Sequence, residues 1–287
     1  MKQHKKGLAL WLAAILLLLA GALLTGSPGK SEGVQEAMRD AVLHDLNRIS
    51  LFGFKDVNPG MISALAVTGI LLVMAVLIRI FAIPRFSYTP GKLQLLVEEA
   101  VSFFDRTAKG NSPHRSGFMG AYIFAAGCYI FVGTLFELLG VQALTTHGSP
   151  ITLPAPLSDV NAAIATGTLS YLVIISGGVA GNGVKGIGKA LKEFSLPISM
   201  SFRLFGALLS GLLVTELVYY YVSLSFVLPV IVGVMFTLLH ALIQTYVLIM
   251  LTALYYGEVS EPEPLKEREK KDSILSVNVW NVRIVLK

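Results

Sequence analysis

The sequence predicts an all-α integral membrane protein with five or six transmembrane helices, the last two long and tilted. Of its 287 residues, 54% are hydrophobic and only 14% are charged, whereas average soluble domains carry about 25% charged residues. The mean hydropathy of +0.69 agrees. Several apolar runs are long enough to cross a hydrocarbon core of ~30 Å, so most of the surface is expected to face lipid or other membrane helices.

The N-terminus has the layout of a secretory signal. Residues 1–6 are basic and residues 7–25 are apolar, so residues 1–26 are interpreted as a signal peptide or a signal anchor. The run is long for a cleaved peptide and no A-x-A site follows it, yet cleavage is slightly favoured. Both interpretations place residue 30 on the outer side.

The rest of the chain divides by hydropathy. Residues 90–107 alternate apolar and charged residues at helical spacing, which predicts a helix on the membrane surface. The expected parts are an outer-side polar segment (27–58), a membrane bundle (59–260) with spans at about 59–83, 117–140, 159–180, 195–222 and 227–256, and a cytoplasmic charged tail (261–287).

Basic residues orient these spans. The N-terminus, 84–116, 181–194 and the tail are basic, whereas 141–158 and the junction near 222–229 contain no Lys or Arg. The two groups alternate across the membrane as the positive-inside rule requires, which predicts a cytoplasmic C-terminus. The segment 27–58 fits less well because it mixes basic and acidic residues.

Composition also excludes some functions. The net charge of +5 comes from basic residues between apolar runs, and no aromatic-plus-basic cluster indicates a nucleic-acid surface. Cys128 is the single cysteine, and no Cys/His spacing predicts a metal site. We expect no cofactor and no metal.

Arg203 is the clearest functional candidate, because it lies well inside an apolar stretch. A charge at mid-span costs about 2.5–3.5 kcal/mol on insertion scales and indicates function by default, and arginine does not neutralise. The alternative is an arginine that snorkels or pairs with a buried acid. Helical spacing places it on a stripe of small residues, Ser199, Arg203, Gly206 and Ser210, although such a stripe alone is also typical of ordinary helix packing.

A second stripe lies on the last helix, where Thr237, His240 and Gln244 share one face. His240 can carry protons because its unperturbed pKa is near 6.5, or it can be a hydrogen-bonded core histidine; both interpretations stay open. Gln244 can reach Arg203 across the helix pair or bond another neighbour.

Three further polar residues are candidates for an ion path. Glu216 lies roughly 140° around the helix from Arg203, so it either lines an aqueous path on another side or sits at the outer membrane surface. Asp159 and Asn161 begin a span, where they either line an ion entry or cap the helix.

The run PISMSFRLFGALLSG resembles the signature of subunit a of F-type ATP synthases, P-[IV]-S-x-x-x-R-L-F-G-N. The later run ALIQTYVLIMLTALYYGE is similar to the family's final helix, and PLSDVNAAIA, KGIG and TPGKLQLLVE fit as well. The resemblance covers about residues 88–260 and is strongest over 195–258.

The resemblance implies a function and partners. Arg203 would face the carboxylates of a rotating c-ring and separate two half-channels for H⁺ or Na⁺, with Gln244 as its partner. The remaining polar candidates would line the ion path: Ser199, Ser210, Glu216, Thr237, His240, Asp159 and Asn161. The implied partners are the c-ring, peripheral stalk subunit b, the remainder of the ATP synthase and membrane lipid, in a bacterial inner membrane. The resemblance implies no catalytic chemistry in the chain itself.

The sequence departs from the family pattern at several places. The asparagine after R-L-F-G is Ala207, the acid nine residues after the arginine is replaced by Leu212, and the usual acid or histidine before the glutamine falls on Thr237. Glu216 lies about one turn beyond Leu212 on a nearby face and can substitute for the missing acid, and His240 lies about one turn from Thr237. The stretch between KGIG and PIS is also shorter than usual.

Three other functions compete with this one. A permease would use buried Arg203 to bind an anion, but it predicts an inverted repeat, and the sequence shows none. An intramembrane protease would pair Ser210 with His240, but Leu209 precedes Ser210, so no G-x-S-G element is present. A purely structural scaffold does not account for Arg203.

Overall fold

A computed structural model describes residues 49–51, 54–144, 150–220 and 228–262, together with residues 13, 16 and 20. The expected signal segment (1–26), most of the polar segment (27–58) and nearly all of the tail (261–287) therefore lie outside the described residues. The backbone of Glu216 belongs to a described helix, but its side chain lies outside the description.

The fold is a bundle of apolar helices, which confirms the predicted all-α membrane class. Four candidate spans qualify by length and composition within the described ranges: Pro59–Arg85, Pro113–Leu139, Val160–Asn182 and Gly233–Ser260. A bent pair, Val184–Lys192 with Ser195–Gly211, makes up to five if it counts as one span. The helix expected near residues 90–107 exists as α4 (Lys92–Asn111), which is not among these candidates.

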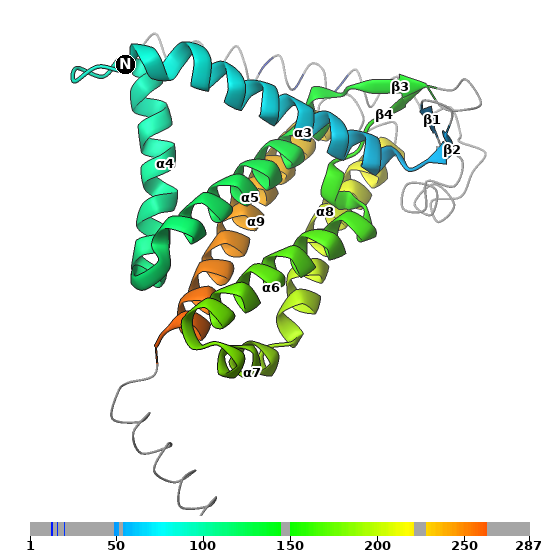
Figure 1. Cartoon of the computed structure of the whole chain (residues 1–287). Helices are drawn as coiled ribbons and strands as arrows, with labels where there is room; N and C mark the ends of the chain where they lie inside the picture. The colour runs from blue at the N-terminus through cyan, green and yellow to red at the C-terminus, as the bar shows by residue number, and fades with distance from the viewer. Residues whose placement is uncertain are drawn as a thin grey trace, which may run out of the picture.

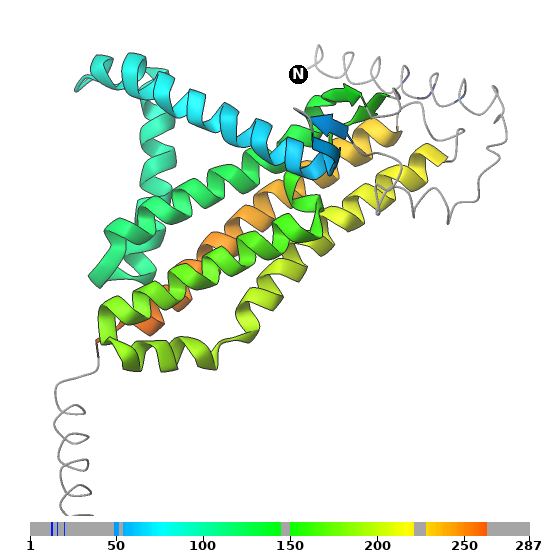
Figure 2. The same ribbon diagram turned by 45° about the vertical axis from the view of Figure 1, so that its right-hand side comes forward.

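Four long helices lie side by side and form the body of the molecule (Figure 1): α5 (Ser116–Phe136), α6 (Val160–Asn182), α8 (Ser195–Tyr220) and α9 (Leu228–Ser260). α6 packs against both α8 and α9, and α5 packs against α9. α3 (Pro59–Leu77) and α4 diverge from this body and close a triangle with α5, as the turned view in Figure 2 also shows.

Helix boundaries follow from local chemistry. α3 begins at Pro59 after Asn58, whose side chain accepts a hydrogen bond from the Gly60 amide at 2.8 Å, a standard N-cap. It continues through a π-helical turn, Ile78–Ala82, and ends in a 3-10 turn containing Pro84, which cannot donate to a longer helix. Beyond α5, Gly140 has φ 58°, a left-handed conformation that terminates helices.

Several hydroxyl groups inside the apolar helices are satisfied locally. Side chains of this kind donate to the carbonyl four residues earlier, which removes the need for an outside partner. The four clearest examples in the bundle core are Thr134 to Ile130, Ser170 to Thr166, Ser201 to Pro197 and Thr252 to Leu248, at 2.6–3.0 Å.

Small residues bring α6 close to its neighbours. A Cβ at Gly167 would lie 2.3 Å from Ser201 Oγ on α8, and one at Gly177 would lie 2.5 Å from the Tyr256 ring on α9. Membrane helices commonly pack through such positions. Because α6 touches both helices this closely, it fixes α8 and α9 relative to each other.

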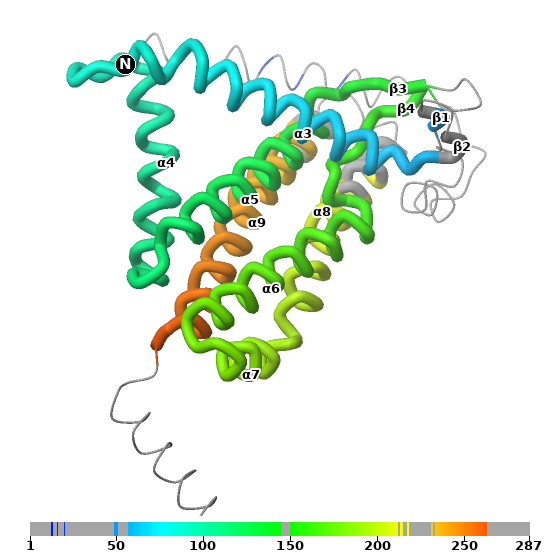
Figure 3. Tube along the Cα trace, viewed as in Figure 1, coloured from blue at the N-terminus to red at the C-terminus, as the bar shows by residue number. Residues whose placement is uncertain are grey.

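The connections contain structure that the sequence did not predict. The basic stretch after α6 forms a short helix, α7 (Val184–Lys192), which lies across the end of the bundle (Figure 3) and meets α8 at 50°. Two small antiparallel sheets lie at the opposite end: β1 (Ile49–Leu51) with β2 (Phe54–Val57), and β3 (Gln142–Leu144) with β4 (Pro150–Thr152).

Candidate functional site

The stripe predicted on α8 lies on the uncovered side of that helix. Ser199, Arg203, Gly206 and Ser210 are all exposed. The opposite side of α8 is buried through Met200, Leu204 and Leu208, which belong to the main apolar core. A Cβ at Gly206 would meet nothing within 4 Å in the described part of the chain, so packing among the described helices does not require a glycine at this position. The stripe is therefore open to whatever surrounds the bundle.

Arg203 carries a permanent charge on this open side. It is the ninth residue of α8, which begins at Ser195, so it lies about 12 Å along the helix axis from that end. A hydrocarbon core of ~30 Å has a half-thickness of ~15 Å. Among the described residues, no hydrogen bond or ion pair reaches its guanidinium. The alternative of a buried acidic partner thus finds no support within the described part of the chain.

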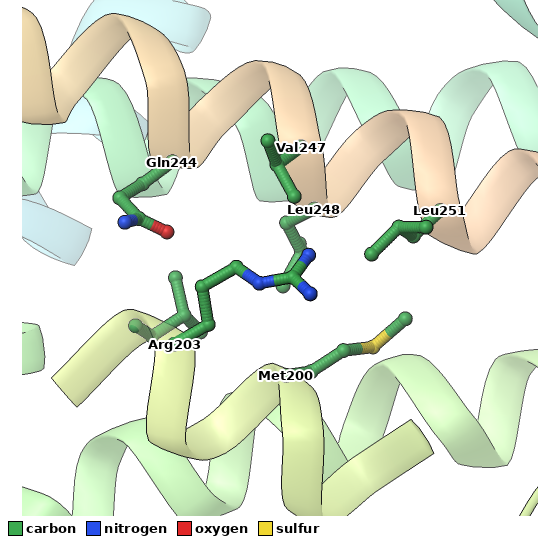
Figure 4. A pocket seen from close by; sticks show the side chains of 7 residues that line it. Met200, Arg203, Gln244, Val247, Leu248 and Leu251 are labelled. Atoms are coloured by element: carbon green, nitrogen blue, oxygen red, sulfur yellow. The ribbon is translucent and has the colours of Figure 1, made fainter. Parts of the chain in front are cut away.

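Arg203 and Gln244 line the same pocket between α8 and α9. Figure 4 shows the Arg203 side chain reaching from α8 toward α9, with the Gln244 amide on the side of the pocket facing α8. Apolar side chains complete the lining: Met200, Leu204, Val247, Leu248 and Leu251. The cavity volume is about 10 Å³, which is roughly what a single water molecule needs. This pocket suits water or an approaching side chain better than a solute.

Gln244 is only 6% exposed, yet within the described ranges no hydrogen bond involves its side chain, including one to Arg203. The Gln244 amide atoms are not among the fully enclosed, unpartnered polar atoms of the described residues, and the residue lines the open pocket. The predicted contact between Gln244 and Arg203 is thus a shared pocket and not a direct bond. The amide is available to a group that enters from outside.

His240 and Thr237 lie further along α9, toward the α8–α9 junction. The imidazole packs against Gly211 of α8, where a Cβ would lie 3.3 Å from Nδ1, and beside Phe236 at 5.9 Å between ring centroids. Spacing alone did not single out Gly211, because its importance depends on where α9 is placed. Ser210 donates to the Ala207 carbonyl at 2.8 Å, and no described hydrogen bond joins it to His240, so the protease pairing gains no support.

The remaining candidates lie at the end of the bundle away from α7. Asp159 caps α6 by accepting a hydrogen bond from the Asn161 amide at 3.3 Å, which is the structural role considered above. The Asn161 side chain is exposed. These two residues are not part of the Arg203 pocket.

The fold and this site define a class: a multi-pass helical membrane protein that presents a permanent cation on the uncovered side of a span. Known proteins identify the family. The family model described as ATP synthase A chain matches residues 61–257, from the start of α3 almost to the end of α9. The chain belongs to this family, which confirms the resemblance found in the sequence.

Individual relatives agree with the family match, because each of them is named ATP synthase subunit a. ATP synthase subunit a of Vibrio cholerae is 27% identical over 204 residues, covering 60% of this chain and 73% of the relative. The subunit of the same name from Aeromonas salmonicida is 26% identical over 252 residues, covering 77% and 94%. That of Histophilus somni is 26% identical over 208 residues, covering 59% and 76%. The chain is thus a multi-pass membrane component of an ATP synthase, with a part in ion transport and ATP synthesis.

Proposed function

We propose that this chain provides the stationary ion path of a rotary ATP synthase and that Arg203 separates its two halves. The observation that carries the proposal is the position of Arg203: a permanent cation at span depth, exposed on α8 and without an acidic partner among the described residues. A lone cation facing lipid is costly. A carboxylate on a neighbouring rotor subunit would supply the missing partner.

The fixed positive charge of Arg203 explains how this residue would separate the two halves of the ion path. A fixed cation in a low-dielectric site lowers the pKa of a nearby carboxyl group, so a rotor carboxylate that approaches Arg203 releases its ion. The same charge opposes passage of a free cation past this point. Ions must then travel around the ring, which couples their flow to rotation. Gly206 and the serines of the stripe allow the close approach that this requires.

The polar candidates divide on either side of Arg203. Ser199 lies toward the α7 end of α8, whereas Ser210 and Glu216 follow Arg203 toward the other end. On α9, Thr237 and His240 precede Gln244, and the contact of His240 with Gly211 places them beyond Arg203 as well. We infer a path on the far side through His240, Thr237, Glu216 and the end marked by Asp159 and Asn161, and one on the α7 side that begins at Ser199.

The basic residues at one end of the bundle indicate how the chain is oriented in the membrane. Asn182 at the end of α6 donates to the Val259 carbonyl near the end of α9 at 3.0 Å, so α9 ends beside the basic α7. By the positive-inside rule this end is cytoplasmic, in the inner membrane of a bacterium. The c-ring would cover the α8 stripe, and the peripheral stalk subunit b would hold the chain stationary.

The deciding experiment compares ATP-driven ion pumping in vesicles that carry the complete complex with wild-type chain or Arg203→Ala. We expect pumping and ATP synthesis to vanish while assembly is retained. Arg106→Ala is the matched control, since Arg106 is an exposed arginine of α4 outside the pocket, and it should pump normally. An assembled Arg203→Ala complex that pumps at the wild-type rate would refute the proposal and direct attention to solute uptake by a permease.

A further inference from the structure

The short helix α7 is fixed on the bundle by one of its faces. Ala190 is fully buried and its carbonyl accepts a hydrogen bond from the Tyr171 hydroxyl of α6 at 3.0 Å. Gly186, one turn earlier, is also buried, and a Cβ there would overlap the Gly178 carbonyl oxygen of α6. The helix is therefore held in one rotational setting, and its two other sides face away from α6.

These two free sides differ in chemistry. At 100° per residue, Lys185, Lys189 and Lys192 fall within an arc of about 60° on one side. Val184 and Leu191 lie roughly 120° from them on the other side and are 85% and 55% exposed. A helix with one apolar and one basic flank is typical of a segment that lies in the membrane interface.

Among the described residues, the lysines of α7 have no acidic partner, unlike two cations of α4. On α4, Arg106 pairs with Glu99 at 2.5 Å and Lys109 pairs with Asp105 at 2.6 Å. Within the described ranges, no ion pair or hydrogen bond neutralises Lys185, Lys189 or Lys192. Three positive charges are thus directed outward from one side of a helix that joins two membrane helices.

We propose that α7 is an interfacial binding site for anionic lipid headgroups. Val184 and Leu191 enter the boundary of the bilayer, and the three lysines contact the phosphates of acidic lipids such as phosphatidylglycerol. Lipid fits better than a soluble partner because the basic flank and the exposed apolar flank lie on one helix, directly between α6 and α8. The site does not depend on the role proposed for Arg203.

Gly188 offers a position for a local probe. It lies between the two flanks of α7, and a Cβ there would meet nothing within 4 Å among the described residues. The complete complex carrying Cys128→Ser and Gly188→Cys is labelled with a small fluorophore at position 188 and placed in bilayers of phosphatidylglycerol and phosphatidylcholine. In one set the phosphatidylglycerol chains are brominated, and in the other the phosphatidylcholine chains. Quenching by each lipid reports its local abundance, and the complex with Gly188 retained gives the labelling background.

We expect brominated phosphatidylglycerol to quench the probe more than its bulk share predicts, and we expect added salt to weaken this preference. The triple variant K185Q/K189Q/K192Q should lower the preference by roughly fivefold or more, and K185R/K189R/K192R should retain it. The matched control R106Q/K109Q on α4 should leave it unchanged.

Quenching by each lipid in proportion to its bulk share, in the labelled complex that keeps all three lysines, would overturn the proposal. Absence of quenching by either lipid would overturn it too, and would indicate that another protein covers α7. Neither result involves ion pumping, so each is separate from the test of Arg203.

Discussion

The imidazole of His240 on α9 lies against the backbone of Gly211 on α8, and a Cβ at position 211 would come within 3.3 Å of Nδ1. This contact joins the two helices that carry the candidate ion path, one turn of α9 before Gln244. The contact also identifies a neighbour of His240 on another helix, which helical spacing in the sequence alone does not show.

Gly211→Leu is therefore expected to destabilise the assembled complex, by about 1–3 kcal/mol as overpacking usually does. His240→Ala in the same chain should relieve much of this loss, because it vacates the space that the leucine needs. The measurement is a double-mutant cycle on thermal stability of the purified complex, with a coupling of about 0.5–3 kcal/mol. Strictly additive effects would show that the two residues do not share this space.

Gly206 tests whether another protein approaches the α8 stripe. A Cβ at Gly206 would meet nothing within 4 Å among the described residues, so we expect the Gly206→Leu subunit to fold and enter the membrane normally. If the rotor lies against this side, ion pumping should fall at least tenfold because the larger side chain blocks close approach. Gly69→Leu on α3, where a Cβ also meets nothing within 4 Å, is the control and should pump as wild type. Normal pumping by the Gly206→Leu complex would place the rotor elsewhere.

The effect of the Gln244 amide group on pumping can be tested separately from the effect of the side chain's volume on packing. Gln244→Leu keeps the volume and removes an amide that has no described partner, so stability should change little, whereas pumping should fall several-fold. Thr245→Val is the matched control: its hydroxyl is also buried and unpartnered among the described groups, but Thr245 does not line the Arg203 pocket. Equal pumping by the two variants would argue against a role for the Gln244 amide.

Gly177 is expected to be intolerant of any side chain. Alanine at this position would place Cβ 2.5 Å from the Tyr256 ring, so α6 and α9 must separate or the ring must move. We expect a loss of roughly 1–3 kcal/mol, measured as a lower temperature at which the purified complex dissociates. Gly69→Ala provides the comparison, and an unchanged transition in Gly177→Ala would mean that the ring relocates without cost.

Asn182 holds the C-terminal end of α9. Its side-chain amide donates to the carbonyls of Val259 and Glu261, at 3.0 and 2.8 Å. Asn182→Ala should release the last turn of α9, and hydrogen exchange at residues 257–261 should accelerate roughly 30-fold, since two hydrogen bonds of ~1 kcal/mol each are lost. Ser176→Ala on the same helix removes only a hydrogen bond internal to α6, so it should leave exchange at the end of α9 unchanged.

Much of this protein is determined by the sequence alone. The apolar runs dictate membrane helices because a backbone in hydrocarbon must satisfy its own hydrogen bonds. Arg203 stands out because its charge has no alternative protonation state, and its spacing from Ser199 and Ser210 fixes which residues share its side of α8. The motif around Arg203 also led to the family, which the match over residues 61–257 confirmed.

Only the tertiary structure decided which sides of these helices are covered. Periodicity in a span that is apolar all around does not distinguish a packed side from an open one, so the exposure of the Arg203 stripe depended on how α6 packs against α8. The pocket shared by Arg203 and Gln244, the contact of His240 with Gly211 and the seating of α7 all join residues from different helices. Close packing at small residues such as Gly167 and Gly177 sets those helix positions, and that packing is a property of pairs of surfaces that no single stretch of sequence contains.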